Sequence, residues 1–292
     1  CTINVFIMLQ AGSYQTLTVS RISDHGIYLA DAEGNEVLLP NRYVSLEDRP
    51  GDTKEVFVYH DSENRPIATT ERPYAVAGEA AFLEVVDKNL HGAFLAWGIT
   101  AKDLFIPNAN QAFRMEPGRR YPVFVYRDNV SGRVVATTKL NGFISNETIT
   151  VRPRQQVDIL VARRIPVGYR VIVENRHWGV LYDNQLFRPV QPGDRLRGYV
   201  NRITEDGRID ISLQQQGFDE VKDAARRLAA LLDQAGGTLT LNDKSAPEEV
   251  AALTGMSKKV FKRALGHLMS RSEVVVADGR ITKKDKNEHT KR

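Results

Sequence analysis

The stretch VFVYHDSENRPIATT, residues 56–70, recurs in related form as VFVYRDNVSGRVVATT at residues 123–138. Each copy has an alternating apolar segment, a polar segment, and a second apolar segment that ends in Ala-Thr-Thr. Alternation with a period of two is typical of β-strands, and Asp, Asn, Ser and Gly are typical of turns. Each copy therefore predicts a β-hairpin. A third, more divergent copy, GYVNRITEDGRIDISL, occupies residues 198–213, with Asp206-Gly207 at its turn.

The repeat extends upstream of each hairpin. Pro40, Pro107 and Tyr182 each lie sixteen residues before the start of a hairpin. A Gly also begins an apolar segment in every copy, at Gly26, Gly92 and Gly168. One period of about 70 residues with about five short strands is too long for a solenoid or propeller repeat and suits a small β-barrel. We therefore predict three tandem five-stranded β-barrels of the OB type.

Length and composition agree with a multidomain globular protein. The chain has 292 residues, of which 42% are hydrophobic and 26% charged. No apolar run approaches the roughly 18 residues that span a bilayer, and no signal-peptide pattern is present. The single Cys, at position 1, excludes an internal disulfide framework and a Cys-rich zinc site. We therefore expect a cytoplasmic protein without a membrane partner. The sequence MLQAGSYQTLTV, from Met8, looks like a natural start, so residues 1–7 are left out of the fold prediction.

Beyond Gln216 the hydrophobic period changes from two to between three and four, which indicates an amphipathic helix over residues 219–234. Gly236-Gly237 ends this helix, and residues 238–241 predict a short strand. We expect Ser245 to cap a second helix, with Glu248 at the capping-box position. Ser257 is expected to cap a third helix, whose apolar face runs from Val260 to Met269.

Asp278-Gly279 predicts a final hairpin between residues 274–277 and 280–282. This order of elements is that of a winged helix-turn-helix. The expected fold is therefore mostly β with a C-terminal α+β domain. The expected domain limits are 8–72 for barrel one, 73–141 for barrel two, 149–215 for barrel three and 217–284 for the winged helix. Residues 283–292 are charged, lack apolar side chains and are expected to be disordered.

No catalytic or metal-binding pattern is present. The chain lacks the glycine-rich phosphate-binding and dinucleotide-binding motifs and the G-x-S-x-G nucleophile motif. Its six His residues have no metal-ligand spacing. We therefore expect no enzymatic activity, no catalytic residue, no metal and no cofactor.

Charge is distributed unevenly over the predicted domains. Residues 1–71 carry 5 basic and 11 acidic side chains, a net charge of −6. The segments 72–140, 141–213 and 214–292 carry net charges of +3, +3 and +4. A polyanion is attracted to the last three segments and repelled by the first. An ordinary solvated surface of mixed charge is the alternative.

OB-type barrels bind single strands by stacking unpaired bases on aromatic side chains, while basic residues follow the phosphates. A stacking position needs a planar side chain on a strand, close to a Gly that lets the backbone approach. Packing in a barrel core or between barrels is the alternative for each ring. The candidates are His25 and Tyr28 in barrel one, His91, Phe94 and Trp97 in barrel two, and Tyr169, Trp178 and Tyr182 in barrel three.

The third predicted helix of the C-terminal domain carries basic side chains opposite its apolar face. In a helix-turn-helix this side enters a groove or lies along a backbone. An ordinary solvated helix face is the alternative. The candidates for phosphate contacts are Lys258, Lys259, Lys262 and Arg263, with His267 on the same side.

The three barrels resemble the S-one RNA-binding domain, an OB-fold module, most closely in GVLYDNQ (179–185) and in the third hairpin. The whole chain resembles the conserved virulence factor B family of bacterial RNA-binding regulators. The segments that carry this resemblance are LLPNRYV (38–44), PIATTERPYA (66–75), GAFLAWG (92–98), VVATTKL (134–140), LNDKSAPEEV (241–250) and GMSKKVFKRALG (255–266).

The resemblance implies cytoplasmic RNA binding, post-transcriptional control of gene expression and no enzymatic activity. It also implies that the exposed aromatic residue of the Gly-Ala-Phe stretch contacts RNA, which falls on Phe94 and Tyr28. A His that the S-one domain usually has at the end of the next strand falls on Pro40, Pro107 and Tyr182. This departure and the acidic charge of barrel one predict that barrel one contributes little RNA affinity.

We therefore expect a non-enzymatic protein that binds single-stranded RNA along barrels two and three and the winged helix. One alternative is a DNA-binding transcription factor that inserts residues 257–271 into the major groove. Such proteins usually dimerise, and no dimerisation segment is evident. The other alternative is a ribosome- or protein-binding scaffold whose barrels do not touch nucleic acid.

Overall fold

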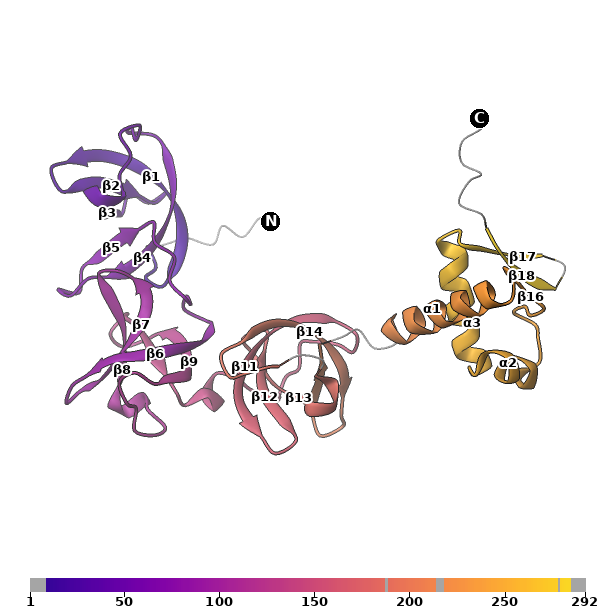
Figure 1. Cartoon of the computed structure of the whole chain (residues 1–292). Coiled ribbons are helices and arrows are strands. Elements are labelled where there is room, and N and C mark those ends of the chain that lie inside the picture. Colours follow the sequence, from indigo (N-terminus) through magenta and orange to yellow (C-terminus); the bar gives the residue numbers. More distant parts are fainter. Residues whose placement is uncertain (1–8, 187–188, 214–217, 278, 285–292) are drawn as a thin grey trace. The chain divides into compact units, whose positions relative to one another are not determined.

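The computed structural model describes residues 9–186, 189–213, 218–277 and 279–284 (Figure 1). The chain divides after Leu213 into two compact units, each of which is considered by itself. Within the described residues, the first unit holds three five-stranded barrels, and the second holds three helices and a three-stranded sheet. The predicted fold class is confirmed. The predicted limits at residues 8, 215 and 217, the turn residue 278 and the predicted disorder from residue 285 lie outside the described residues.

Barrel one is closed, with the strand order β1-β2-β3-β5-β4. Its only parallel pairing within the described residues joins β3 and β5. The predicted alternation in β4 is confirmed and has a consequence: Val56 and Val58 face the core of barrel one, whereas Phe57 and Tyr59 belong to the core cluster of barrel two. The strands are β1 (Ser13–Ser23), β2 (Gly26–Ala30), β3 (Glu36–Pro40), β4 (Thr53–His60) and β5 (Pro66–Thr69).

Barrels two and three repeat this topology. Barrel two is a five-stranded sheet in the order β10-β9-β6-β7-β8, and barrel three is closed in the order β11-β12-β13-β15-β14. A short 3-10 helix follows the third strand of each barrel: η1 (Asn41–Tyr43), η2 (Asn108–Asn110) and η4 (Asp183–Gln185). The strands are β6 (Ala80–Lys88), β7 (Gly92–Ile99), β8 (Lys102–Pro107), β9 (Arg120–Arg127), β10 (Val134–Thr137), β11 (Gln156–Ile165), β12 (Gly168–Val173), β13 (His177–Tyr182), β14 (Arg195–Ile203) and β15 (Ile209–Ser212).

The Gly at the start of the second strand of each barrel lets two strands approach closely. Gly26 has φ +146° and Gly168 has φ +149°. A Cβ atom would lie 2.0 Å from a backbone oxygen of β3 at Gly26 and 2.1 Å from a backbone oxygen of β13 at Gly168. Gly92 is equally restricted, since its Cβ atom would lie 2.3 Å from an oxygen of β8. These positions accept only Gly, which fixes the register between the second and third strands.

Barrels one and two share a core around Trp97. The Trp97 ring makes edge contacts with Phe57 at 5.5 Å and with Tyr59 at 6.4 Å between ring centroids. Its Nε1–H donates a hydrogen bond to the Ala75 carbonyl oxygen at 2.8 Å, and the side chain is only 2% exposed. A ring enclosed in this way offers no face to a base. The prediction that Trp97 binds nucleic acid is therefore wrong, and Trp97 joins the two barrels.

Barrels two and three also pack together, through a smaller apolar cluster. It joins Phe124 of barrel two to Leu160 and Ile172 of barrel three. Polar contacts accompany this packing. The Ala80 N–H donates to Oδ1 of Asn175 at 3.0 Å, and the Arg195 guanidinium donates to the Ala80 carbonyl oxygen at 2.7 Å.

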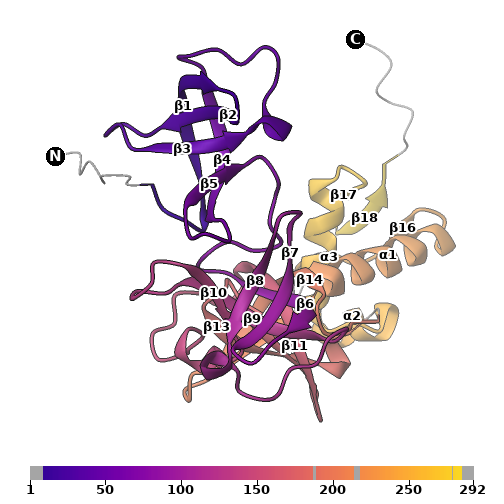
Figure 2. The ribbon, with the colours of Figure 1, turned by 90° about the vertical axis from the view of Figure 1, so that its left-hand side faces the viewer.

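The second unit has the predicted winged-helix order. Its helices pack over a core that includes Leu228 of α1, Val250 of α2 and Phe261 of α3. The two views in Figures 1 and 2 show α1 beside α3. The strands form a sheet in the order β16-β18-β17. The elements are α1 (Phe218–Gln234), β16 (Thr238–Leu239), α2 (Pro247–Thr254), α3 (Lys258–Ser270), β17 (Val274–Ala277) and β18 (Arg280–Lys283).

The start of α3 is as predicted, whereas the start of α2 is displaced. The Ser257 hydroxyl caps α3 by accepting a hydrogen bond from the Val260 N–H. The N-cap of α2 is Ala246, one residue later than expected, and its N–H donates to the Glu249 carboxylate. Ser245 instead closes the preceding turn, where its hydroxyl accepts from the Asn242 N–H at 3.0 Å. Met269, expected on the apolar face of α3, is exposed.

No helix in the described part of the chain is both long enough and apolar enough to span a membrane.

We predict that Trp97→Ala destabilises barrels one and two together. Removing a large buried aromatic side chain costs about 3–5 kcal/mol of the free energy of unfolding. Urea denaturation followed by circular dichroism should show this loss. The control is Leu90→Ala in the same barrel, which is 91% exposed and should change stability by less than about 0.5 kcal/mol. Equal stability of the two variants would contradict the shared core.

Candidate nucleic-acid interface

The surface of barrel three contains an open hollow of about 410 Å³. Arginines from three elements line it: Arg163 of β11, Arg170 of β12, and Arg208 just before β15. Trp178 of β13 supplies an aromatic side chain, and Asp206 is the one carboxylate in the described lining. The hollow therefore combines a planar ring with an excess of positive charge.

Strand register shows which side chain of barrel three corresponds to Tyr28 and Phe94. Gly26, Gly92 and Gly168 occupy the same position, opposite Pro40, Pro107 and Tyr182. The residue two places after each Gly is Tyr28, Phe94 or Arg170. Sequence reasoning chose Tyr169 and missed Arg170. Counting from the repeated Gly could have identified it.

Arg170 and Trp178 form a stacked pair. The guanidinium carbon of Arg170 lies 4.0 Å from the centroid of the Trp178 ring. Burial and the like charge of Arg163 lower the pKa of Arg170, yet an arginine stays charged at neutral pH. Neither Arg163 nor Arg170 makes an ion pair with a carboxylate among the described residues, so the charge of both is uncompensated.

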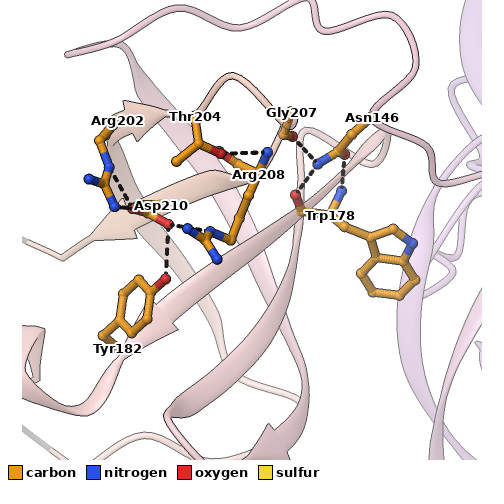
Figure 3. A network of polar contacts seen from close by, with 8 residues as sticks. All are labelled: Asn146, Trp178, Tyr182, Arg202, Thr204, Gly207, Arg208 and Asp210. Atoms are coloured by element: carbon orange, nitrogen blue, oxygen red, sulfur yellow. Dashed lines mark hydrogen bonds and ion pairs between the residues drawn. The ribbon is translucent and has the colours of Figure 1, made fainter.

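A polar network fixes the strands beside the hollow (Figure 3). Asp210 of β15 is 3% exposed and accepts two hydrogen bonds from Arg202, at 3.0 and 2.7 Å. Arg208 lies 3.5 Å from the same carboxylate, and the Tyr182 hydroxyl donates to it at 3.1 Å. Burial and the Asp210 carboxylate raise the pKa of Tyr182, because both disfavour the phenolate. Tyr182 thus supports this network from the end of β13.

Asn146 connects Trp178 to the turn between β14 and β15 (Figure 3). Its amide NH₂ donates to the carbonyl oxygens of Trp178 and Gly207 at 2.8 and 2.9 Å. Its side-chain oxygen accepts from the Trp178 N–H at 2.8 Å. The indole Nε1–H donates to Oδ1 of Asn141 at 3.1 Å. Asn146 therefore holds the backbone of Trp178 with two hydrogen bonds and the turn with a third, and Asn141 fixes the orientation of the Trp178 ring.

Tyr169 packs inward. Its position corresponds to the buried Ile27 and Ala93 of the other barrels. The ring contacts the core of barrel three, and its hydroxyl donates to the Val190 carbonyl oxygen at 2.6 Å. This hydrogen bond and the half-buried ring assign Tyr169 to the barrel rather than to the hollow.

In barrel one, the side chain of Arg21 covers the candidate stacking ring of Tyr28. The Arg21 guanidinium lies 3.5 Å from the centroid of Tyr28, and Arg21 is paired with Glu36 at 2.8 Å. The positive charge beside this ring is thus already neutralised. His25 is exposed one residue before β2.

In barrel two, Phe94 is half-buried and packs against Phe105 with ring centroids 5.2 Å apart. Both rings line a second cavity, as does the exposed His91.

Helix α3 presents its predicted basic side to solvent. Lys259, Lys262 and Arg263 are exposed, and Lys258 is half-buried. The opposite side is buried through Phe261 and Leu265. Among the described residues, the three lysines form no ion pair with a carboxylate.

No group of three or more His, Cys, Asp or Glu side chains that could hold a metal ion occurs within the described residues.

Comparisons with known proteins agree with this architecture. A model described as "S1 domain" matches residues 11–71 and 77–139, which cover barrels one and two. A model described as "CvfB-like winged helix domain" matches residues 226–282. The chain therefore contains two S1 domains and a CvfB-like winged helix domain. Neither model describes an enzyme family, and both support nucleic-acid binding.

Similar proteins match the chain over nearly its whole length. A Bacillus subtilis (strain 168) protein named YitL is 27% identical over 93% of each chain. The conserved virulence factor B of Staphylococcus saprophyticus is 22% identical, over 92% of this chain and 93% of its own. A crystal structure of a multidomain protein with nucleic acid binding domains from Streptococcus pneumoniae TIGR4 is 21% identical, with a TM-score of 0.40 over 94% of this chain and 98% of its own.

We predict that Tyr182→Phe costs about 1 kcal/mol of the free energy of unfolding at pH 7, through the lost hydrogen bond to Asp210. Because the folded state raises the pKa of Tyr182, the wild-type protein has its full stability below the unfolded pKa of about 10 and loses stability as the pH rises further. The difference between the two proteins should therefore shrink at pH 11. Urea denaturation at both pH values tests this; a constant difference would contradict it.

Proposed function

We propose that the protein is a non-enzymatic binder of single-stranded RNA that acts as a post-transcriptional regulator in the cytoplasm. The observation that carries this proposal is the hollow of barrel three, which Arg163, Arg170 and Arg208 line together with Trp178. Aromatic rings and guanidinium planes both stack on unpaired bases, and uncompensated arginines attract phosphates. Such a site suits splayed single-stranded bases better than a closed duplex.

Barrel one is proposed to contribute little to this strand path. Its net charge of −6 over residues 1–71 opposes phosphate, and Arg21 already covers Tyr28. The path therefore comprises the barrel-three hollow, with Phe94 of barrel two and helix α3 as further contacts. The regulatory role is proposed from the resemblance to the conserved virulence factor B family, and one of the similar proteins carries that name.

A second candidate function is DNA binding by the winged helix. Helix α3 favours it, because a basic helix on an apolar core is what a helix-turn-helix places in a major groove. Competition binding at stated salt, with single-stranded RNA, single-stranded DNA and duplex DNA, separates the candidates. Preference for single-stranded RNA supports the proposal, preference for duplex DNA favours the transcription factor, and binding to none favours a protein-binding scaffold.

We predict that Arg163→Gln flattens the slope of log affinity for single-stranded RNA against log salt by about 0.7. The matched control is the neighbouring Arg164→Gln, because Arg164 is already paired with Asp183 at 2.8 Å. Arg164→Gln should leave the slope nearly unchanged. Fluorescence anisotropy over a salt series measures both slopes, and identical slopes would contradict a role for the hollow.

We predict that changing Lys258, Lys259 and Lys262 together to Gln reduces the salt slope by roughly 2 units on a single strand, and by nearly 3 on a duplex. Stability should hardly change, since exposed charges contribute little. The control is Arg226→Gln on α1, where Arg226 is exposed and paired with Asp223 at 2.6 Å. A loss confined to duplex DNA would favour the transcription-factor function, and a wild-type slope on every nucleic acid would leave the three lysines as a solvated face.

A further inference from the structure

A second cavity, of about 270 Å³, lies in the first unit where barrel one meets barrel two. The β4–β5 hairpin of barrel one contributes His60, the last residue of β4, and Asp61 of the turn to its wall. Barrel two contributes the rings of Phe94 and Phe105 and the cations Lys102 and Arg133. In Figure 1 this hairpin lies close to β7 of barrel two. The barrel-three hollow is farther along the chain and shares none of its lining residues.

The two cations of this cavity are not neutralised by the turn they touch. The Lys102 ammonium donates to the Asp61 backbone carbonyl at 3.3 Å, and the Arg133 Nε–H donates to Oδ1 of Asn64 at 2.6 Å. Neither cation forms an ion pair with a carboxylate among the described residues. The turn therefore holds both cations through neutral oxygens.

The carboxylate of Asp61 is used within its own turn. It accepts from Nε of Arg65 at 2.9 Å, and from the backbone N–H groups of Glu63 and Arg65, both at 2.9 Å. These hydrogen bonds and Arg65 lower the pKa of Asp61, although burial opposes them. Asp61 is thus satisfied without Lys102 or Arg133, whose charges stay available for a ligand.

The basic groups around the cavity disfavour one another. Burial lowers the pKa of His60, and so do the charges of Arg133 and Lys102. Burial and Arg133 likewise lower the pKa of Lys102. The buried Nδ1 atom of His60 has no hydrogen-bond partner among the described residues. The carboxylates of Asp61 and Asp103 oppose the lowering of the pKa of Lys102 but do not cancel it. An anion at Lys102 and Arg133 would relieve the remaining repulsion, and it would find donors in place.

The cavity also has an aromatic wall. Phe94 and Phe105 are cross-strand neighbours on β7 and β8, and their rings are tilted by 43°. Asn89 adds a polar group: its side-chain oxygen accepts from the N–H groups of His91 and Gly92, so its NH₂ group remains a donor. Phosphate-binding cations beside a stacking surface match the chemistry of a nucleotide.

We propose that this cavity binds one nucleoside monophosphate group, either as a free nucleotide or as the phosphorylated end of an RNA strand. The base lies against Phe94 and Phe105, and the phosphate lies at Lys102 and Arg133. Ligand pockets usually hold roughly 300–1,000 Å³, so a cavity near the lower limit suits one nucleotide rather than a continuous strand. The site includes Phe94, which the proposed function already counts as a strand contact. It goes beyond that function because barrel one forms a wall of the cavity and because Lys102 and Arg133 supply a phosphate site.

The test is isothermal titration calorimetry of the full chain with AMP, adenosine and inorganic phosphate. AMP should bind more tightly than either of its parts. Lys102→Gln and Arg133→Gln should each weaken AMP binding about tenfold or more, since a charge-assisted hydrogen bond is lost. The matched controls in barrel two, Lys88→Gln and Arg120→Gln, lie outside the cavity lining and should bind AMP as the wild type does.

A second measurement is independent of how well the variants fold. In the wild-type chain, AMP should raise the pKa of His60, as followed by NMR of its imidazole, whereas adenosine should not. The titratable and charged groups that line the cavity with His60 are Asp61, His91, Lys102, Asp103 and Arg133. Lys102→Arg keeps the charge and should keep AMP binding.

The two sources of the ligand are separated with short oligoadenylates. Tighter binding of an oligomer with a terminal phosphate than of the same oligomer with a terminal hydroxyl, with competition by AMP, assigns the site to a strand end. If AMP binds but the two oligomers bind equally well, the site is assigned to a free nucleotide. Failure of both AMP and the phosphorylated oligomers to bind, or equal binding of AMP and adenosine, overturns the inference. A chain that binds RNA through Arg163 but not AMP would overturn this inference alone.

Discussion

The contact on which the rest of the barrel geometry depends is the approach of one Gly to the backbone of the next strand. At Gly26 and Gly168, no side chain could fit between the second and third strands. This contact allows a single register, because a slip of one residue would exchange the faces of every side chain. The register in turn decides that Tyr28, Phe94 and Arg170 occupy one equivalent surface position. One backbone constraint, repeated three times, therefore places three chemically different side chains where a ligand would be met.

The side chains that surround this surface position differ from one barrel to the next, so the position is not equally accessible in all three. In barrel one, Arg21 covers Tyr28 and Glu36 neutralises Arg21. In barrel two, Phe94 faces a cavity that the turn of barrel one partly encloses. In barrel three, Arg170 lies over Trp178 beside a further uncompensated arginine. The same fold thus provides a closed surface, an enclosed cavity and an open hollow.

The repeat in the sequence was enough to predict the barrels, because strand alternation and turn residues are local signals. The winged helix was predictable for the same reason, through its helix period and the Ser257 cap. Trp97 was misjudged because burial between two barrels depends on residues far apart in sequence. Strand alternation alone places Trp97 on the same face of β7 as the buried Ala93 and Leu95, opposite to Phe94. Tyr169 was predicted as the contact because it is aromatic. The position equivalent to Phe94 lies two residues after Gly168 and is occupied by Arg170, which is not aromatic.

The packing of Phe57 and Tyr59 against Trp97 also has a consequence for synthesis of the chain. Domains generally fold as units while the polypeptide emerges from its N-terminus. Here two aromatic rings of barrel one, Phe57 and Tyr59, lack their packing partner Trp97 until the second strand of barrel two has been made. Barrel one therefore cannot bury its full apolar surface as a nascent domain, and its last folding step waits for the barrel that follows.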